Sequence, residues 1–342
     1  MEDGEDGTVN NKSLFTTPHL WIELEINLSI SGVYFMPRIA RQKYEGAIYH
    51  IMARSISEVD LFKTDEDKKQ YMILIKEYQK VYNFKIYAYC LMNNHVHLIV
   101  GSNGADISKI MHCINFKYAR YFNILHKRHG HLFQDRFKSR IVKDNRYLIE
   151  LSAYIHNNPL DVRGYENNPE DYYYSSLAIY MGLRKDEFNI IDKKFILSLF
   201  GSDDSKSKQR YMKLVLRTKS VFLDNITEEE TEFIEEKSEY RSEMKILVRN
   251  FDPEDIVSYI AEKFGLEKSL LYLKYKKEVM PMRAVIVLLL RNLCNRSCKD
   301  ICGILGNITS SRVSKLSSIG VDLVSNDNRY KNIISDFISL CA

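Results

Sequence analysis

The sequence lacks any apolar run long enough to cross a membrane. The longest, Ala284–Leu290, is far shorter than the roughly 20 residues that a spanning helix needs. The acidic start, Met1–Asp6, also lacks the basic and apolar regions of a signal peptide. Cysteine is scarce, with six residues and no Cys-x-x-Cys pair, which is a poor disulfide framework and typical of a reducing compartment. We therefore expect a cytoplasmic protein without a membrane partner.

A strong excess of one charge is also missing. The 342 residues include 49 Lys and Arg against 45 Asp and Glu, a formal net charge of +4. Any binding to nucleic acid must therefore come from local clustering of charge and not from the total. The hydrophobic content of 45% is ordinary for a globular protein, and no internal repeat or long low-complexity tract is visible.

The length suggests two domains. Residues 1–35 are polar and do not match the rest of the chain, so they are either an extra arm or the product of a mis-assigned start codon before Met36. We predict a first domain over residues 36–200. Residues 201–209, rich in Gly, Ser and Asp, are predicted to be a linker, and residues 210–342 to be a helical domain.

The first domain alternates between strand and helix patterns. The expected elements are strand 47–54, helix 64–82, strands 85–91 and 95–101, helix 107–127, strand 137–142 and helix 146–157. The order β-α-β-β-α-β predicts an α+β, ferredoxin-like (split βαβ) fold, an antiparallel sheet with helices on one face. The last helix is appended to this arrangement and ends before Pro159.

Two histidines stand two residues apart in the strand predicted over 95–101. His95 and His97 should point to one face of the sheet while Val96 points to the core. Two neutral imidazoles on one face of a rigid strand are suited to holding a divalent cation. A pair of this kind is more often solvated or engaged in ordinary hydrogen bonds, so a second group of residues must support the metal hypothesis.

The second group lies on the appended helix. Tyr154 and Asn158 are four residues apart, which places them on one helix face. A tyrosine beside a metal-bound phosphate can act as a nucleophile, and the amide oxygen four residues on is a possible metal ligand. Because Asn158 precedes Pro159, we expect it to leave the helical conformation and to reach the site from a frayed last turn.

A basic segment lies between these two groups. Residues 108–146 contain ten Lys and Arg against two Asp, interleaved with aromatic residues. Basic groups that hold phosphates, together with rings that stack on bases, are typical of a surface for single-stranded nucleic acid. The alternative is a solvated helix face whose aromatic residues turn to the core. For the loop and strand of residues 130–138 we favour binding.

Four segments carry a common pattern: Met-Pro-Arg at 36–38, Asn-Asn-His-Val-His at 93–97, Gly-His-Leu-Phe-Gln-Asp-Arg-Phe at 130–137 and Tyr-Ile-His-Asn-Asn-Pro at 154–159. Together they resemble the REP-associated tyrosine transposases, the single-tyrosine branch of the HUH nucleases. The resemblance covers roughly residues 36–180. It implies that His95 and His97 bind Mg²⁺ or Mn²⁺, that Asn158 completes the metal shell, and that Tyr154 is the nucleophile.

The resemblance also implies an activity and a partner. The expected reaction is cleavage and rejoining of hairpin-bearing single-stranded DNA through a 5′-phosphotyrosine, by a monomer or homodimer associated with the nucleoid. The residues predicted to contact DNA are Arg38, Lys117, Arg120, Arg136, Lys138, Arg140, Arg312 and Lys315. Two alternatives remain. One is a domesticated regulator that binds palindromic repeats with little catalysis, and the other is a metal-dependent hydrolase in which Tyr154 is structural.

The C-terminal half carries a weaker pattern. Ser297 is predicted to cap a short helix, and a turn at Asn307–Thr309 leads to a polar and basic helix that begins at Ser310. This order is typical of a helix-turn-helix and weakly resembles the DnaA-type DNA-binding domain. Arg312 and Lys315 would then face DNA, whereas the alternative is a plain helical bundle.

Overall fold

The computed structural model describes residues 46–218, 249, 251–273, 277–306 and 308–341. The chain divides into two units, Met1–Gln42 and Lys43–Ala342, and the described residues all belong to the second. The predicted N-terminal arm, the Met-Pro-Arg segment and Arg38 lie outside the described residues. Within them, no helix is long and apolar enough to cross a membrane.

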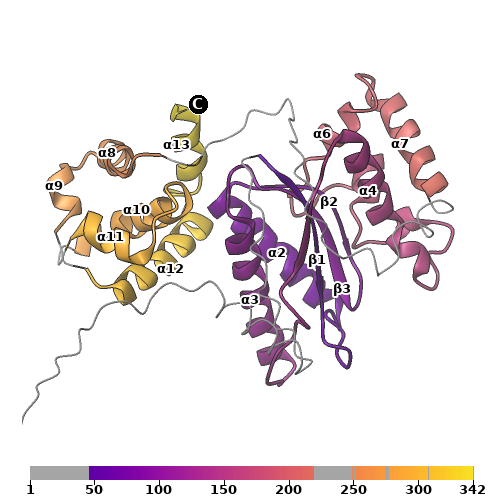
Figure 1. The fold of residues 1–342 in the computed structure, drawn as a ribbon, viewed down its shortest axis with the longest axis horizontal. Helices are drawn as coiled ribbons and strands as arrows, with labels where there is room; N and C mark the ends of the chain where they lie inside the picture. Colours follow the sequence, from indigo (N-terminus) through magenta and orange to yellow (C-terminus); the bar gives the residue numbers. More distant parts are fainter. Residues whose placement is uncertain (1–45, 219–248, 250, 274–276, 307, 342) are drawn as a thin grey trace, which may run out of the picture. The chain divides into compact units, whose positions relative to one another are not determined.

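Four antiparallel strands form one sheet (Figure 1). They are β1 (Ile48–Arg54), β2 (Lys85–Leu91), β3 (His95–Gly101) and β4 (Lys138–Ile141). Their order, β2-β3-β1-β4, is that of the split βαβ arrangement. Helices α2 (Asp65–Tyr82) and α3 (Ile107–Leu125) pack against each other beside the sheet. The predicted α+β, ferredoxin-like fold is confirmed.

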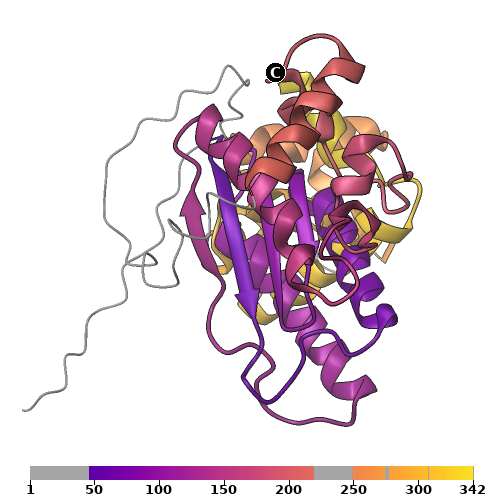
Figure 2. The same cartoon turned by 90° about the vertical axis from the view of Figure 1, so that its right-hand side faces the viewer.

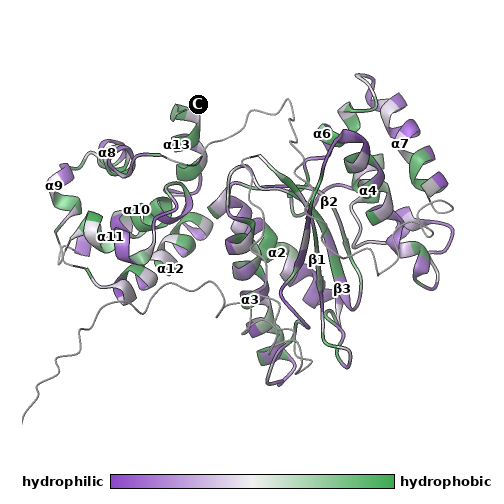
Figure 3. Cartoon of the chain, viewed as in Figure 1, coloured by the Kyte–Doolittle hydropathy of each residue, from purple (hydrophilic) through white to green (hydrophobic). Residues whose placement is uncertain are grey.

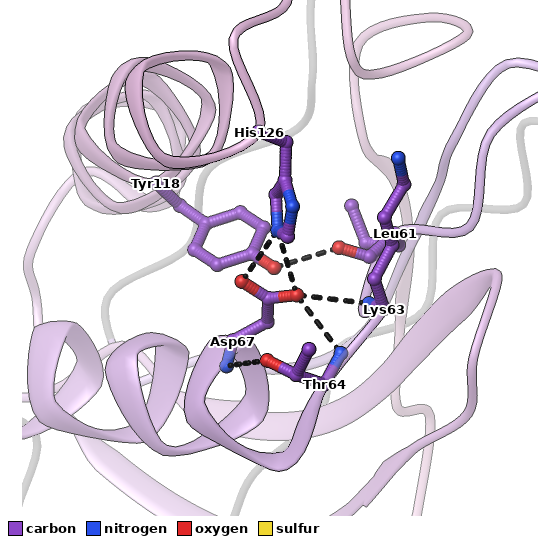
Figure 4. A network of polar contacts seen from close by, with 6 residues as sticks. All are labelled: Leu61, Lys63, Thr64, Asp67, Tyr118 and His126. Atoms are coloured by element: carbon purple, nitrogen blue, oxygen red, sulfur yellow. Dashed lines mark hydrogen bonds and ion pairs between the residues drawn. The ribbon is translucent and has the colours of Figure 1, made fainter.

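A buried carboxylate joins α2 to α3 (Figure 4). Asp67, in the first turn of α2, accepts hydrogen bonds from the backbone N–H groups of Lys63 and Thr64, while the Thr64 hydroxyl caps the helix by accepting from Asp67 N. Nε2 of His126, at the C-terminus of α3, lies 3.0 Å from both carboxylate oxygens of Asp67. This network ties the start of one helix to the end of the other.

The two faces of β3 have different roles. Val96, Leu98 and Val100 are fully buried, and because side chains alternate along a strand, His95 and His97 share the opposite face. The prediction that both histidines point the same way is therefore confirmed by the register of the sheet, in which Arg54 and Met52 of β1 lie opposite them.

Helix α4 (Asn145–Asn157) covers the histidine face of the sheet, on the side away from α2 and α3 (Figures 1 and 2). Asp144 caps its start by accepting from Tyr147 N. The expectation of helices on one face thus holds for α2 and α3, but α4 is an exception. The physical reason is that the histidine face is apolar on the β2 side, where Ala88, Cys90 and Ile99 are buried. Helix α4 packs on β2 and β3, and its side chains of Leu148, Leu151 and Ile155 are buried.

The prediction that residues 201–209 form a linker is wrong. Helix α7 (Asp204–Thr218) begins inside this range, and Asp203 accepts a hydrogen bond from Lys206 N at 3.1 Å. The cluster of Ser and Asp therefore acts as a helix start signal. Helix α7 is amphipathic (Figure 3), and its Tyr211 and Val215 are fully buried. The short helices between α4 and α7 are η1 (Asn158–Asp161), η2 (Pro169–Asp171), α5 (Leu177–Met181) and α6 (Lys193–Ser198).

The described C-terminal residues are helical, as predicted. The elements are α8 (Pro253–Lys263), α9 (Lys268–Leu271), η4 (Lys277–Val279), α10 (Met280–Asn292), α11 (Cys298–Leu305), α12 (Ser310–Asn326) and α13 (Ile333–Cys341). Helix α10 is the centre of their core, with Ala284 to Leu290 all buried. Gly320 of α12 allows the two helices to approach closely, because a Cβ there would collide with the Ala284 carbonyl.

Candidate active site

The candidate site is built on β3. The rings of His95 and His97 have centroids 5.0 Å apart and lie nearly perpendicular to each other. His97 is only 4% exposed, whereas His95 is partly accessible. Nδ1 of His95 lies 2.6 Å from the side-chain oxygen of Asn94, which leaves Nε2 of His95 for other partners.

Helix α4 brings the other two predicted residues to the same place. The ring of Tyr154 lies edge-on to that of His97, with centroids 6.0 Å apart. The side chain of Asn158 is hydrogen-bonded to that of His95. The structure thus brings together four residues from segments far apart in the sequence, His95, His97, Tyr154 and Asn158; their roles are predictions.

Asn158 differs from expectation in its backbone. Its φ of −52° and ψ of −35° are helical, and η1 continues directly from it. The predicted fraying before Pro159 is therefore wrong. Nδ2 of Asn158 donates to the Tyr154 carbonyl at 3.0 Å, and this bond closes the last turn of α4. Because the amide nitrogen is engaged, the side-chain oxygen is the atom of Asn158 that can bind a metal or a ring N–H.

Burial keeps both candidate ligands neutral. The pKa of His97 is held well below its ordinary value of 6.5, mainly by desolvation and further by the imidazoles of His50 and His95. The pKa of His95 is also lowered, mainly by desolvation, although its hydrogen bond to Asn158 acts in the opposite direction. Neutral imidazoles have a lone pair to offer a cation at neutral pH.

A third histidine, His50 of β1, was not predicted. Its Nε2 lies 2.9 Å from Nδ1 of His97, and the two rings are stacked with centroids 5.2 Å apart. Burial, with a smaller effect of the Arg140 charge, lowers the pKa of His50 to about 4. Since Nδ1 of His97 is occupied by His50, Nε2 is the nitrogen of His97 that remains for a metal. His50 is visible in the sequence, but only the pairing of β1 with β3 brings it to His97.

The donors present are two imidazole nitrogens and one amide oxygen. In the part of the chain that the structure describes, no three His, Cys, Asp or Glu side chains are placed to hold a metal ion. The available protein donors are the imidazoles of His95 and His97 and the amide oxygen of Asn158. Two nitrogens and one oxygen leave coordination positions for water and phosphate oxygens. The oxygen ligands suit Mg²⁺ and Mn²⁺, whereas imidazole nitrogens suit a borderline transition metal, so Mg²⁺ or Mn²⁺ stays a prediction.

Two of the predicted DNA-contacting residues lie on the same face of the sheet as this site. Lys138 and Arg140 of β4 pair in register with Met52 and His50 of β1, so their side chains share the face that carries the histidines. Both are exposed, as is Arg136 just before the strand. Strand β4 is an edge of the sheet.

The other predicted contacts are not brought to this face. Lys117 and Arg120 lie on α3, behind the opposite face of the sheet (Figure 1), and Lys117 is ion-paired with Glu77 at 2.5 Å. Arg312 and Lys315 are exposed on α12. Spacing alone did not reveal this separation, because the basic segment of residues 108–146 runs through both layers of the domain.

Comparisons with known proteins give one family match and one match to a solved structure. Residues 43–158 match the family model "Transposase IS200 like". A solved structure described as the "REP associates tyrosine transposase bound to a REP hairpin" aligns with a TM-score of 0.37 and 16% sequence identity, over 43% of this chain and 86% of that chain. No curated protein matches the sequence. The matched segment, residues 43–158, includes β1 to β4 and α4, and over this segment the chain is similar to the IS200-like transposases.

Proposed function

We propose that this protein is a metal-dependent DNA strand transferase that cleaves and rejoins single-stranded, hairpin-bearing DNA through a 5′-phosphotyrosine. The observation that carries the proposal is the convergence of Tyr154 with His95, His97 and Asn158 on one face of the sheet. A nucleophilic hydroxyl beside a set of neutral nitrogen and oxygen donors is the arrangement that phosphodiester transfer needs.

The chemistry follows from these groups. The Tyr154 hydroxyl oxygen bonds to phosphorus and the P–O3′ bond breaks, while the proton lost by the tyrosine is balanced by the one gained by the departing 3′-oxygen. The 5′ end is then joined to Tyr154, and attack by a 3′-hydroxyl on this linkage rejoins DNA without a nucleotide cofactor. When bound by His95, His97 and Asn158, Mg²⁺ or Mn²⁺ would orient the phosphate and neutralise charge on its oxygens.

The edge strand β4 supports the choice of substrate. Arg136, Lys138 and Arg140 follow one another at every second position, and all three are exposed. Their charges would bind successive phosphates of a strand that passes the site. A hairpin beside the cleavage site is the substrate that the resemblance to REP-associated transposases implies.

The experiment that tests the proposal is a cleavage assay on labelled single-stranded hairpins from the DNA that flanks the gene, resolved on denaturing gels. It compares wild type with Tyr154→Phe, in Mg²⁺, in Mn²⁺ and in chelator. We expect a metal-dependent covalent protein–DNA adduct that is lost by many orders of magnitude in Tyr154→Phe. Tyr147→Phe, a partly buried tyrosine of the same helix, is the matched control and should retain the adduct.

Two other outcomes would contradict the proposal. Tight hairpin binding without an adduct in any metal would favour the regulator of palindromic repeats. Cleavage that persists in Tyr154→Phe would favour the metal-dependent hydrolase, in which water attacks and the tyrosine has a structural role.

The C-terminal helices suggest a second DNA-binding surface. The short α11 and the longer α12 pack against each other. Near the start of α12, Val313 and Leu316 are buried while Arg312 and Lys315 are exposed. A short helix followed by a helix with an exposed basic face is the form of a helix-turn-helix. We propose that α12 binds duplex DNA, in addition to the hairpin at the sheet.

A further inference from the structure

Resting on the proposed function, we propose that α7 is a positioning element for the nucleophile. Through Tyr211 it holds α4 against the sheet of its own chain, so that Tyr154 attacks a phosphate bound by the histidines of the same polypeptide. Tyr211 is then a positioning residue, since it acts on the reaction through α4 and does not touch the reacting groups.

The two sides of α4 have separate tasks. Tyr154 and Asn158 are four residues apart and share the side that meets His97 and His95. Ser152 and His156 are also four apart, but they are offset by two residues from the first pair, which is roughly 200° around a helix. They therefore point away from the candidate site, toward α7, which lies beside α4 (Figures 1 and 2).

A chain of buried hydrogen bonds runs from α7 through α4 to the sheet. The Tyr211 hydroxyl lies 3.0 Å from Oγ of Ser152 and 2.7 Å from Nδ1 of His156. Nε2 of His156 lies 2.7 Å from Oγ of Ser176, and this hydroxyl accepts from the backbone N–H of Tyr89 on β2 at 3.0 Å. Ser152, His156, Ser176 and Tyr211 are all 0% exposed.

A second hydrogen bond between α7 and α4 lies next to Asn158, the candidate metal ligand. Nδ2 of Asn157, the residue before Asn158, donates to the Val215 carbonyl of α7 at 2.7 Å. Sliding or turning α4 would break this bond and the Tyr211 bonds together, and would leave buried polar groups without partners. Because such groups are costly to bury unpaired, the position of α4, and hence of Tyr154, is held in one place.

Helix α7 is outside the segment that matches the transposase family. The family model ends at residue 158, whereas α7 covers Asp204–Thr218. Helix α7 therefore lies beyond the matched segment, and its buried face is directed at the helix that carries Tyr154. The Tyr211 hydroxyl contacts Ser152 and His156 of α4, and the Val215 carbonyl contacts Asn157, as expected for an element that sets geometry.

The first experiment mixes two full-length variants, one with His97→Ala and one with Tyr154→Phe. Each lacks one half of the site, so an adduct in the mixture requires a tyrosine of one chain to serve the histidines of another. We expect the mixture to form no more adduct than either variant alone. An adduct approaching half the wild-type yield would overturn the proposal.

The second experiment removes the contact itself. Tyr211→Phe keeps the ring and deletes the hydroxyl, and we expect the rate of adduct formation to fall about 10- to 100-fold, as for a slightly misplaced reacting group, with hairpin affinity unchanged. Tyr71→Phe is the matched control, because its fully buried hydroxyl bonds to Asn115 and not to α4. An unchanged rate in Tyr211→Phe, or an equal loss of hairpin affinity, would overturn the proposal.

A third readout does not depend on catalysis. Hydrogen exchange of the α4 amides should accelerate at least 10-fold in Tyr211→Phe, while exchange in β1 and β3 stays as in wild type. If wild type forms no adduct, the proposed function is contradicted, but hydrogen exchange still tests whether α7 holds α4 in place. Unchanged exchange in α4 would show that α7 does not hold it.

Discussion

At the scale of single residues, the site depends on how each histidine is held. His97 has one nitrogen against His50 and is almost fully buried, so its ring can offer only the other nitrogen to a metal. A hydrogen bond to the far nitrogen of a ligating histidine fixes its tautomer and raises its basicity. Metal-binding proteins commonly use a carboxylate or carbonyl for this contact, whereas the partner of His97 in the proposed site is a second imidazole.

We predict that His50→Leu weakens Mn²⁺ binding about 10- to 100-fold, because it removes the acceptor for the His97 N–H. His50→Gln, whose amide oxygen can accept, should retain most of the affinity. Calorimetric titration of the apoprotein with Mn²⁺ measures both. Equal affinities for His50→Leu and wild type would show that the contact does not act on the metal site, and hairpin binding in chelator controls for folding.

Because His156 is buried, the free energy of unfolding should depend on pH. Burial lowers its pKa to about 3 in the folded protein, whereas an unfolded histidine has a pKa of about 6.5. Between these values the unfolded chain binds more protons, so stability is complete above pH 6.5 and falls as the pH falls toward 3. This one group should lower the free energy of unfolding by about 2 kcal/mol between pH 7 and pH 5.

We predict that His156→Gln, although less stable at pH 7, loses about 2 kcal/mol less than wild type on going to pH 5. Urea unfolding at both pH values measures the difference. His112→Gln, which removes an exposed histidine of α3, is the control and should behave as wild type. If both variants have the wild-type pH slope, His156 does not carry this effect.

At the scale of elements, the position of a basic residue matters more than its number. Strand β4 places Lys138 and Arg140 on the histidine face of the sheet, whereas α3 places Lys117 and Arg120 behind the other face. A strand of DNA whose phosphate lies at Tyr154 can follow β4 directly. To reach α3 it would have to pass around the sheet, so the two basic groups should differ in their effect on binding.

We predict that Lys138→Ala with Arg140→Ala weakens hairpin binding and reduces the slope of log affinity against log salt by about 1.4, or about 0.7 for each lost phosphate contact with a single strand. Lys117→Ala with Arg120→Ala removes the same charge from α3 and should change the slope little. Fluorescence anisotropy over a salt series measures both. A larger change of slope in the α3 variant than in the β4 variant would indicate that the DNA binds along α3.

At the scale of the whole molecule, two kinds of DNA surface are proposed. One is the histidine face of the sheet with β4, and the other is the exposed start of α12. Single strands are bound through phosphates and stacked bases, whereas a helix-turn-helix places a helix in the major groove of a duplex. The two surfaces should therefore respond to different DNA and be separable by substitution.

We predict that Arg312→Ala with Lys315→Ala reduces affinity for duplex DNA from the gene's flanks about 10-fold or more, with the rate of adduct formation on a short hairpin unchanged. Gel-shift titration and the cleavage assay report the two properties separately. A matched loss in both assays would show that α12 acts on the hairpin, and no loss in either would favour a plain helical bundle.

Local patterns in the sequence were sufficient for the strands and long helices of residues 47–157, though not for the start of α7, and for the pairs of residues within those elements. His95 and His97 share a face because side chains alternate along a strand, and Tyr154 and Asn158 share a face because of the helical repeat. The cap predicted at Ser297 was readable for the same reason, since its hydroxyl accepts from the backbone N–H of Asp300, three residues on. These properties depend on near neighbours in the chain, and the amino-acid sequence determines them directly.

Only the tertiary structure decided which distant segments meet. The contact of His50 with His97 depends on the register of β1 and β3. The hydrogen bond between Tyr211 and His156 depends on the packing of α7 against α4. The separation of Lys117 from Lys138 depends on which face of the sheet each element covers. Such pairings depend on the burial of apolar surface over the whole domain. Residues that meet in this way have no fixed separation in the sequence, so a local sequence pattern cannot predict the contact.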